Sequence, residues 1–302
     1  MPSGWSEPVK ILHLNPEHPE ENQILVEGLE REVRLFHLSD THLPEADARD
    51  PNPARLAAAH FQPYFQQRTP GGIPTREVSL GLMERCRVLS PDALALTGDI
   101  LHFPSVAGLE LLARNLGGQE YLYTLGNHDW HFPYHPWSAA TRQAHYPRFF
   151  AFSGGNPACQ VKQVGGLRLI ALDNSIYQVS AAQVEFLRRQ LQNGKPCLLL
   201  VHIPLVVPSL MPSVMARWDA PIVMGGEDGW TAEARAKWMV GEVAPSTRAC
   251  LELVQQAENL VGILCGHVHF PRADQMRPGC FQYVARPGFE GGCRMLNFKP
   301  YR

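Results

Sequence analysis

The sequence has little net charge and lacks the segments that would place a chain in a membrane or direct it to export. Its formal charge is −2 at pH 7 with histidine neutral, and basic residues do not cluster, which argues against binding to nucleic acid or an anionic membrane through bulk electrostatics. No apolar run approaches membrane-spanning length. The first residues, Met-Pro-Ser-Gly-Trp-Ser-Glu, lack the charged and apolar regions of a signal peptide. We therefore predict a cytoplasmic protein that acts on a small molecule; the oligomeric state stays open.

Paired cysteines are also missing. The seven cysteines form no C-x-x-C motif, and most of them lie in apolar runs. An odd number of such residues favours buried, reduced thiols over a disulfide framework or a cysteine-rich zinc site.

What the chain does have is a large apolar fraction and many histidines. With 302 residues, 45% of them hydrophobic, it can bury a sizeable core as one large domain or two small ones. Several of the 13 histidines stand next to Asp, Asn or Gly, which is typical of polar turns and of metal sites.

Strands and helices are expected to alternate along the chain. Short apolar or β-branched runs predict strands at residues 8–14, 23–29, 33–38, 93–97, 121–124, 159–172 (a hairpin around Gly165-Gly166), 197–201, 260–265, 281–285 and 293–298. Helical spacing predicts helices at about 53–61, 75–89, 105–116, 138–150, 180–193, 231–240 and 246–258. The alternation indicates an α/β fold.

Five of the predicted strands end in polar side chains of one chemical kind. The segments that follow these strands are Asp40-Thr41-His42, Gly98-Asp99, Gly126-Asn127-His128-Asp129, His202, and Gly266-His267-Val268-His269. Any one of them could be an ordinary polar turn. Because sites in α/β sheets form at the carboxyl ends of strands, five such segments together predict one shared site.

The donors in these segments suit a pair of metal ions. They comprise carboxylates, an amide and imidazoles: Asp40, His42, Asp99, Asn127, His202, His267 and His269. Nitrogen and oxygen donors without thiolate favour Mn, Fe or Zn, with Ni or Co as further options. Two ions would activate a shared hydroxide for attack on a phosphate ester. His128 would protonate the leaving group while Asp129 holds its tautomer.

Two stretches leave alternatives open. The aromatic residues Trp130, His131, Tyr134 and His135 could line a pocket or pack as a loop against a helix. The apolar run Leu205–Met215 could be a lid or an oligomer contact.

The five segments resemble, in order, the motif blocks of the calcineurin-like metallophosphoesterase superfamily. The resemblance spans residues 40–269. It implies an α/β fold, a four-layer αββα sandwich with two central mixed β-sheets. We expect a single domain over residues 1–302, with an N-terminal β-hairpin at about 8–30. Insertions are expected at about 44–76 and 204–230, and these two segments together with residues 130–138 are expected to decide the substrate.

The resemblance also implies roles for individual residues. One metal would take Asp40, His42, Asp99 and His269, and the other would take Asp99, Asn127, His202 and His267. Asp99 would bridge them, and His128 would be the general acid.

Differences from the motif blocks of other branches indicate which branch of the superfamily this chain resembles most. Leu125 and the segment Asp99-Ile100-Leu101-His102 differ from protein serine/threonine phosphatases. His102 stands where purple acid phosphatases have a tyrosine ligand, and His128 is absent from lipid-A-type pyrophosphohydrolases. The pattern looks most like bacterial cyclic-nucleotide-phosphodiesterase-like members. It predicts a dinuclear phosphoesterase, a phosphodiesterase before a monoesterase, in which a metal-bridging hydroxide attacks the phosphorus. The alternative is a non-catalytic binding scaffold of the same fold, which would be expected to have lost His128 or a ligand.

Overall fold

The computed structural model describes residues 9–302. Two sequence predictions lie partly or wholly outside that range: residue 8 of the predicted strand 8–14, and the N-terminal segment that lacks signal-peptide features. The strands are β1 Ile11–His13, β2 Glu21–Val26, β3 Val33–Leu38, β4 Ala93–Thr97, β5 Tyr121–Thr124, β6 Cys159–Val164, β7 Leu167–Leu172, β8 Cys197–Leu200, β9 Leu260–Cys265, β10 Arg272–Arg277, β11 Cys280–Val284 and β12 Arg294–Pro300. Each predicted strand is present within a few residues. β10 was not predicted, because its sequence, Arg-Ala-Asp-Gln-Met-Arg, has no apolar run.

The strands form two six-stranded mixed sheets. Their orders are β1-β2-β12-β3-β4-β5 and β10-β11-β9-β8-β7-β6. Within the first sheet β3, β4 and β5 are parallel neighbours, and within the second β7, β8, β9 and β11 are parallel. The parallel strands therefore end at a common edge of each sheet. The five predicted segments begin at these edges, after β3, β4, β5, β8 and β9.

Eight α-helices surround the sheets in the described part of the chain. They are α1 Asn52–Gln66, α2 Thr75–Leu89, α3 Val106–Leu116, α4 Ala139–His145, α5 Ala181–Leu191, α6 Met211–Trp218, α7 Ala232–Trp238 and α8 Pro245–Gln256, with 3₁₀ turns η1 Pro70–Gly72, η2 Tyr146–Phe152 and η3 Gly288–Glu290. The predicted helix at 138–150 is α4 followed by η2, because Pro147 lies at the start of the 3₁₀ turn. The short helix predicted at 53–61 is longer, and α6 was not predicted.

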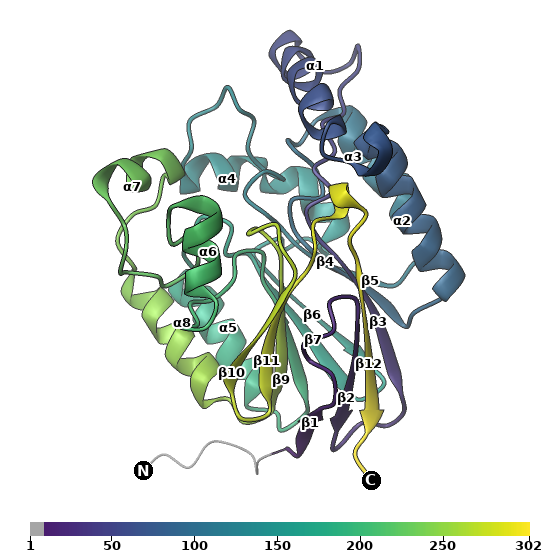
Figure 1. Cartoon of the computed structure of the whole chain (residues 1–302), viewed down its shortest axis with the longest axis vertical. Coiled ribbons are helices and arrows are strands. Elements are labelled where there is room, and N and C mark those ends of the chain that lie inside the picture. The colour runs from purple at the N-terminus through teal and green to yellow at the C-terminus, as the bar shows by residue number, and fades with distance from the viewer. Residues whose placement is uncertain (1–8) are drawn as a thin grey trace.

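Alternating side chains divide the core into three zones and so set the layers. In β4, Ala93 and Ala95 face the second sheet, whereas Leu94 and Leu96 face the outer helices. The same alternation in β8 sends Leu198 and Leu200 inward and Leu199 outward. Helices α2 and α3 cover the outer face of the first sheet and α5 and α8 that of the second, on the right and left of Figure 1. The fold is the four-layer αββα sandwich that the resemblance of the motif blocks implied.

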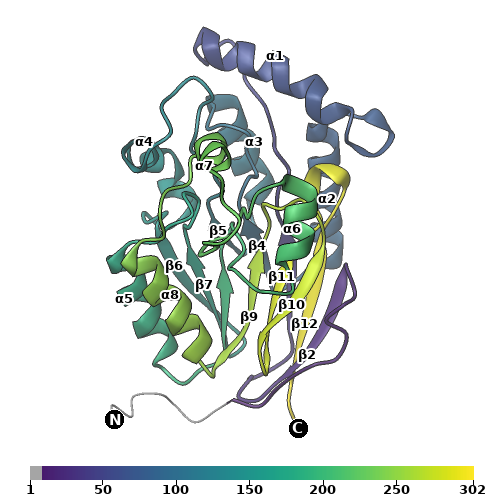
Figure 2. The same ribbon diagram turned by 60° about the vertical axis from the view of Figure 1, so that its left-hand side comes forward.

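Helices of the two insertions lie outside the two sheets, and part of the second insertion packs into the core. Helix α1 stands above the strand ends in both views, and α6 lies in front of the second sheet in Figure 2. The apolar side chains Leu205, Leu210 and Val214 of the second insertion are fully buried in the core of that sheet. Core packing accounts for these buried side chains, and the lid or oligomer contact expected for Leu205–Met215 stays a prediction.

All seven cysteines are unpaired, and six of them are buried, as the sequence predicted. Among residues 9–302 no helix is both long enough and apolar enough to cross a bilayer. The cytoplasmic location stays a prediction.

Candidate active site

The five polar segments meet at one place. Asp40 and His42 follow β3, Asp99 follows β4, and Asn127 and His128 follow β5. His202 follows β8 in the other sheet, and the pair His267 and His269 follows β9. Residues that are 227 positions apart in the sequence, Asp40 and His267, are in hydrogen-bond contact, since the His267 amide lies 3.1 Å from both Asp40 carboxylate oxygens. The strand ends thus gather the predicted donors as expected.

One group of donors consists of Asp40, His42 and His269. Asp40 Oδ1 lies 3.3 Å from His269 Nε2 and 3.9 Å from His42 Nε2. The two Nε2 atoms are 3.1 Å apart. The three donor atoms could hold one ion.

The second group consists of Asp99, His202 and His267, with Asn127 beside it. Asp99 Oδ2 lies 3.2 Å from His202 Nε2, and Asn127 Oδ1 lies 3.1 Å from the same nitrogen. Donor atoms of Asp99, His202 and His267 lie close enough together to hold a second ion. Asp99 Oδ2 is also 3.7 Å from His42 Nε2 of the first group, so this one carboxylate oxygen faces both groups.

The geometry of His42 fits a cation at the first group. Its Nδ1 lies 3.1 Å from Nδ1 of His102, so a proton on Nδ1 of His42 would be donated there. Nε2 of His42 then presents a lone pair toward Nε2 of His269 in a buried setting. Two lone pairs at that distance repel unless a proton or a cation lies between them, and nitrogen and oxygen donors suit a first-row divalent ion.

The backbone at the donors is held in an uncommon conformation. Five of the donor residues have left-handed φ angles: Asp40 (54°), His42 (44°), Asp99 (51°), His267 (69°) and His269 (56°). Each such residue costs of order 1 kcal/mol or more and persists only when the surrounding fold imposes it. The strand ends therefore hold these side chains in one fixed arrangement, as a metal site requires.

Glycine is needed where the donor loops approach one another. A Cβ on Gly266 would lie 1.9 Å from Ser39 Oγ and 2.2 Å from Asp40 Oδ2. On Gly126 it would lie 2.2 Å from Asp99 Oδ1. The glycines of the Gly-His-x-His and Gly-Asn-His-Asp segments therefore make room for the carboxylates of other segments.

The Gly266→Ala variant is expected to be destabilised by about 1–3 kcal/mol or more, because the added methyl group must displace Ser39 and Asp40. Its urea-unfolding midpoint should fall and its metal content should drop. The control is Gly81→Ala in α2, where nothing lies within 4 Å of the added Cβ, so stability should be equal or slightly higher. Equal midpoints for the two variants would contradict the packing argument.

The orientation predicted for Asp129 is wrong. Its carboxylate accepts hydrogen bonds from the backbone amides of Asp99 (2.8 Å), Leu101 (2.8 Å) and Gly126 (2.7 Å) rather than holding the imidazole of His128. Burial, together with the nearby Asp99 carboxylate, raises the pKa of Asp129 to about 7. Asp129 is thus a positioning residue that ties the loop after β4 to the loop after β5.

His128 stands at the wall of the cavity beside the donor groups. Its ring lines the cavity above the donors, and its amide donates to Asp99 Oδ1 at 2.8 Å. The ring stacks on His102, with centroids 4.4 Å apart and planes inclined by 20°. Burial lowers the pKa of His128, while the Asp99 carboxylate acts in the opposite direction.

Three residues around the donors were missed in the sequence. His102 contacts His42 as described, Tyr177 Oη lies 2.8 Å from His267 Nε2, and Asn174 Oδ1 accepts from the amide of His202 at 3.0 Å. Tyr177 and Asn174 follow β7, another parallel strand of the second sheet. The signal available was the same as for the donors, a polar residue after a buried strand.

A cavity of about 460 Å³ opens above the two groups. Besides site residues it is lined by Phe61, Tyr64, Phe65, Arg68, Arg217, Trp218, Trp238, Phe289 and Glu290. None of the four aromatic-loop candidates is among them. Trp130 is fully buried and donates from Nε1 to Ser175 Oγ at 2.9 Å, so the packed-loop alternative holds for it, and the aromatic wall comes mainly from α1, α6 and α7.

The comparisons with known proteins agree with this arrangement. The family described as "Calcineurin-like phosphoesterase" matches residues 33–271. A dimetal phosphatase from Danio rerio superposes with a TM-score of 0.52 at 12% identity, covering 85% of this chain and 88% of that one. A purple acid phosphatase from yellow lupin (Lupinus luteus) gives a TM-score of 0.53 at 12% identity, covering 90% of this chain and 47% of that one.

These two structures share the fold at low identity, and a search of curated proteins finds no match. The family match covers most of the chain and includes every predicted donor. It implies divalent metal ions, for which the two donor groups offer sites. The chain belongs to the calcineurin-like phosphoesterase family, and it is by that membership a metal-dependent phosphoesterase.

Proposed function

We propose that the chain is a dinuclear metal-dependent hydrolase of a small phosphate ester. The observation that carries this proposal is the position of Asp99. Its Oδ2 lies 3.2 Å from His202 Nε2 and 3.7 Å from His42 Nε2, so one carboxylate serves both donor groups. A shared carboxylate brings two ions within reach of a single phosphate.

Seven residues would hold the two ions. The first ion would take Asp40, His42, Asp99 and His269, and the second Asp99, Asn127, His202 and His267. Two divalent ions, with Mn, Fe or Zn proposed first, supply charge neutralisation at the phosphate and lower the pKa of water. Both functions suit hydrolysis at neutral pH.

The chain's own residues would orient the ester and move one proton. A water oxygen forms a bond to phosphorus, the bond from phosphorus to the leaving oxygen breaks, and His128 gives its proton to that oxygen. The attacking water loses one proton to the bulk solvent, and His128 takes up a proton from the solvent before the next turnover. The hydrogen bond from the His128 amide to Asp99 Oδ1 fixes this backbone against the donor carboxylate. Asp129 holds the two loops in register through its three amide contacts.

Among ester classes we propose phosphodiesters before monoesters. The support is the motif pattern, which resembles the cyclic-nucleotide-phosphodiesterase-like branch. The absence of a tyrosine at position 102 distinguishes the site from the purple acid phosphatase pattern, since His102 occupies that place and contacts His42 through nitrogen.

The metal requirement gives the direct test. Purified protein is expected to carry up to two first-row metal ions per chain by elemental analysis. Treatment with a chelator should abolish hydrolysis of bis-p-nitrophenyl phosphate and p-nitrophenyl phosphate, because the site supplies no other charge of this size. Added Mn²⁺ should restore it. Failure to hydrolyse any phosphoester with any first-row metal would reject the proposed function.

A further inference from the structure

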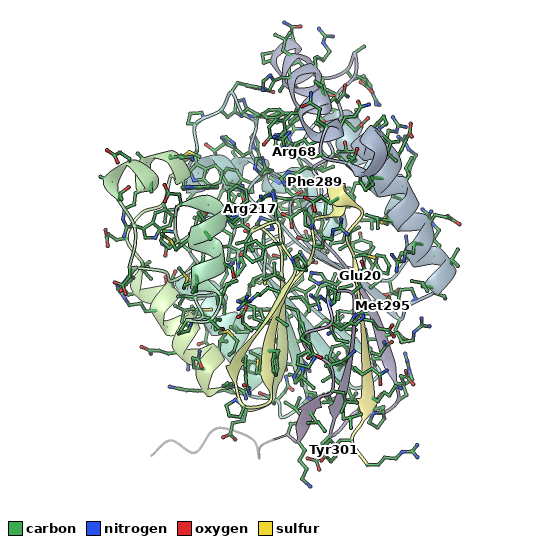
Figure 3. All side chains as sticks on the ribbon, viewed as in Figure 1. Glu20, Arg68, Arg217, Phe289, Met295 and Tyr301 are labelled. Carbon is green, nitrogen blue, oxygen red and sulfur yellow. The ribbon has the colours of Figure 1, made fainter. Side chains whose placement is uncertain are left out.

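Two arginines stand at the cavity and come from the two insertions. Arg68 follows α1 in the first insertion, and Arg217 lies near the end of α6 in the second. Both line the cavity above the donor groups, together with Phe289. Figure 3 shows these three side chains gathered above the strand ends. Segments far apart in the sequence therefore bring two positive charges to one cavity.

Neither arginine has an acidic partner. Within residues 9–302 no carboxylate lies within 4.0 Å of Arg68 or Arg217, whereas Arg76, also close to the first insertion, is paired with Glu45 at 3.3 Å. Glu290 also lines the cavity, but its carboxylate lies 3.5 Å from Arg286 Nε. The charge that these walls offer to a ligand is therefore positive.

The guanidinium of Arg68 is exposed, but it is held against a neighbouring aromatic ring. Its Cζ lies 3.7 Å from the centre of the Tyr64 ring, and Nη1 donates to the Tyr64 carbonyl oxygen at 2.5 Å. This uses one of the five N–H groups of an arginine. The remaining donors keep the fork geometry that suits phosphate and carboxylate.

Arg217 is supported less tightly, with Cζ 5.7 Å from the ring centre of Trp218. Tyr64 and Trp218 also line the cavity. The volume of about 460 Å³ falls in the range of sites for drug-sized ligands, and is larger than one phosphate group requires. The remaining cavity volume and the two arginines therefore suit a ligand group in addition to the reacting phosphate.

We propose that the substrate carries a second anionic group, which Arg68 and Arg217 bind while the reacting phosphate lies at the donor groups. This inference rests on the proposed function and names its substrate class: a phosphate ester with a further phosphate or carboxylate on the same organic part. The organic part lies along the aromatic wall. The two insertions thereby select the substrate, and the strand-end residues perform the reaction.

The test uses two substrates that differ in one group. Thymidine 5′-(p-nitrophenyl phosphate) is compared with the same ester bearing a 3′-phosphate, using the metal-loaded full chain. The wild type should prefer the 3′-phosphorylated ester by about tenfold or more in kcat/KM, as charge-assisted hydrogen bonds to phosphate imply. The double variant Arg68→Gln/Arg217→Gln should lose this preference. The control Arg55→Gln removes one exposed charge from α1, outside the cavity, and should keep the preference.

Binding gives a readout that does not depend on turnover. Calorimetric titration of the chelator-treated protein with thymidine 3′,5′-bisphosphate should show tighter binding than with thymidine 5′-monophosphate, and the double variant should remove the difference. Equal kcat/KM for the two esters in the wild type, or a preference that survives in the double variant, would overturn the inference. Hydrolysis of neither ester nor of bis-p-nitrophenyl phosphate would instead count against the proposed function, and the titration would still decide the role of the arginines.

Discussion

The Asp99→Asn variant is expected to lose at least about a hundredfold in kcat, since several kcal/mol of charge stabilisation depend on the ions that this carboxylate joins. Asparagine has nearly the same shape, and it can still accept the hydrogen bond that the His128 amide donates to Asp99 Oδ1 at 2.8 Å in the wild type. It lacks the charge that faces His202 and His42. The metal content should fall below that of the wild type.

The measurement combines kcat on bis-p-nitrophenyl phosphate with elemental analysis of the same samples. Asp228→Asn makes the same chemical change at an exposed aspartate that does not line the cavity, and both readouts should match the wild type. Full activity and full metal content in Asp99→Asn would remove the central observation behind the two-ion proposal.

The His128→Asn variant should separate proton transfer from metal binding. Asparagine can occupy part of the same space beside His102 but cannot deliver a proton. The loss should reach about 10²–10⁴-fold in kcat for an alkyl ester, whose leaving oxygen needs protonation. It should be much smaller for a p-nitrophenyl ester, whose leaving group departs as a stable anion. Metal content should stay at the wild-type value, because His128 is not among the seven proposed ligands.

The leaving-group comparison distinguishes a catalytic residue from a structural one. A general loss of folding would lower both rates by the same factor. The matched control is His60→Asn, an exposed histidine of α1 outside the cavity lining, which should leave both rates unchanged. An equal loss on alkyl and p-nitrophenyl esters would show that His128 does not act as the general acid.

The gathering of the donors was predictable because a simple rule connects sequence to position. Buried strands such as β4 and β9 are recognisable as apolar runs, and parallel strands end at one edge of a sheet. The polar residue that follows each run, Asp99 or His267, is then placed without knowledge of the packing. The rule would also have found Asn174 and Tyr177, which follow β7, had it been applied to that strand.

The direction of a side chain within a turn could not be predicted in the same way. Asp129 is next to His128 in the sequence, and adjacency suggested that its carboxylate would support the imidazole. In the structure the carboxylate turns to three backbone amides instead. Two of these belong to the loop after β4, so the outcome depended on a neighbouring loop that the local sequence does not describe.

The cavity wall shows the same limit over longer distances. Trp130 is aromatic and adjacent to the site in sequence, yet it is fully buried beneath it. Arg68 and Arg217, with nothing around them to mark a site, reach the cavity from α1 and α6.

By itself the sequence determined most of the order of strands and helices, the α/β class and the candidate donors, because these follow from apolar periodicity and from the chemistry of residues at strand ends; the layered sandwich was implied by the resemblance of the motif blocks. Only the tertiary structure decided which carboxylate faces both donor groups, which aromatic residues are core and which form a wall, and where the unpaired arginines stand. Those outcomes depend on contacts between segments that lie tens to hundreds of residues apart, and such contacts leave no periodic pattern in the chain.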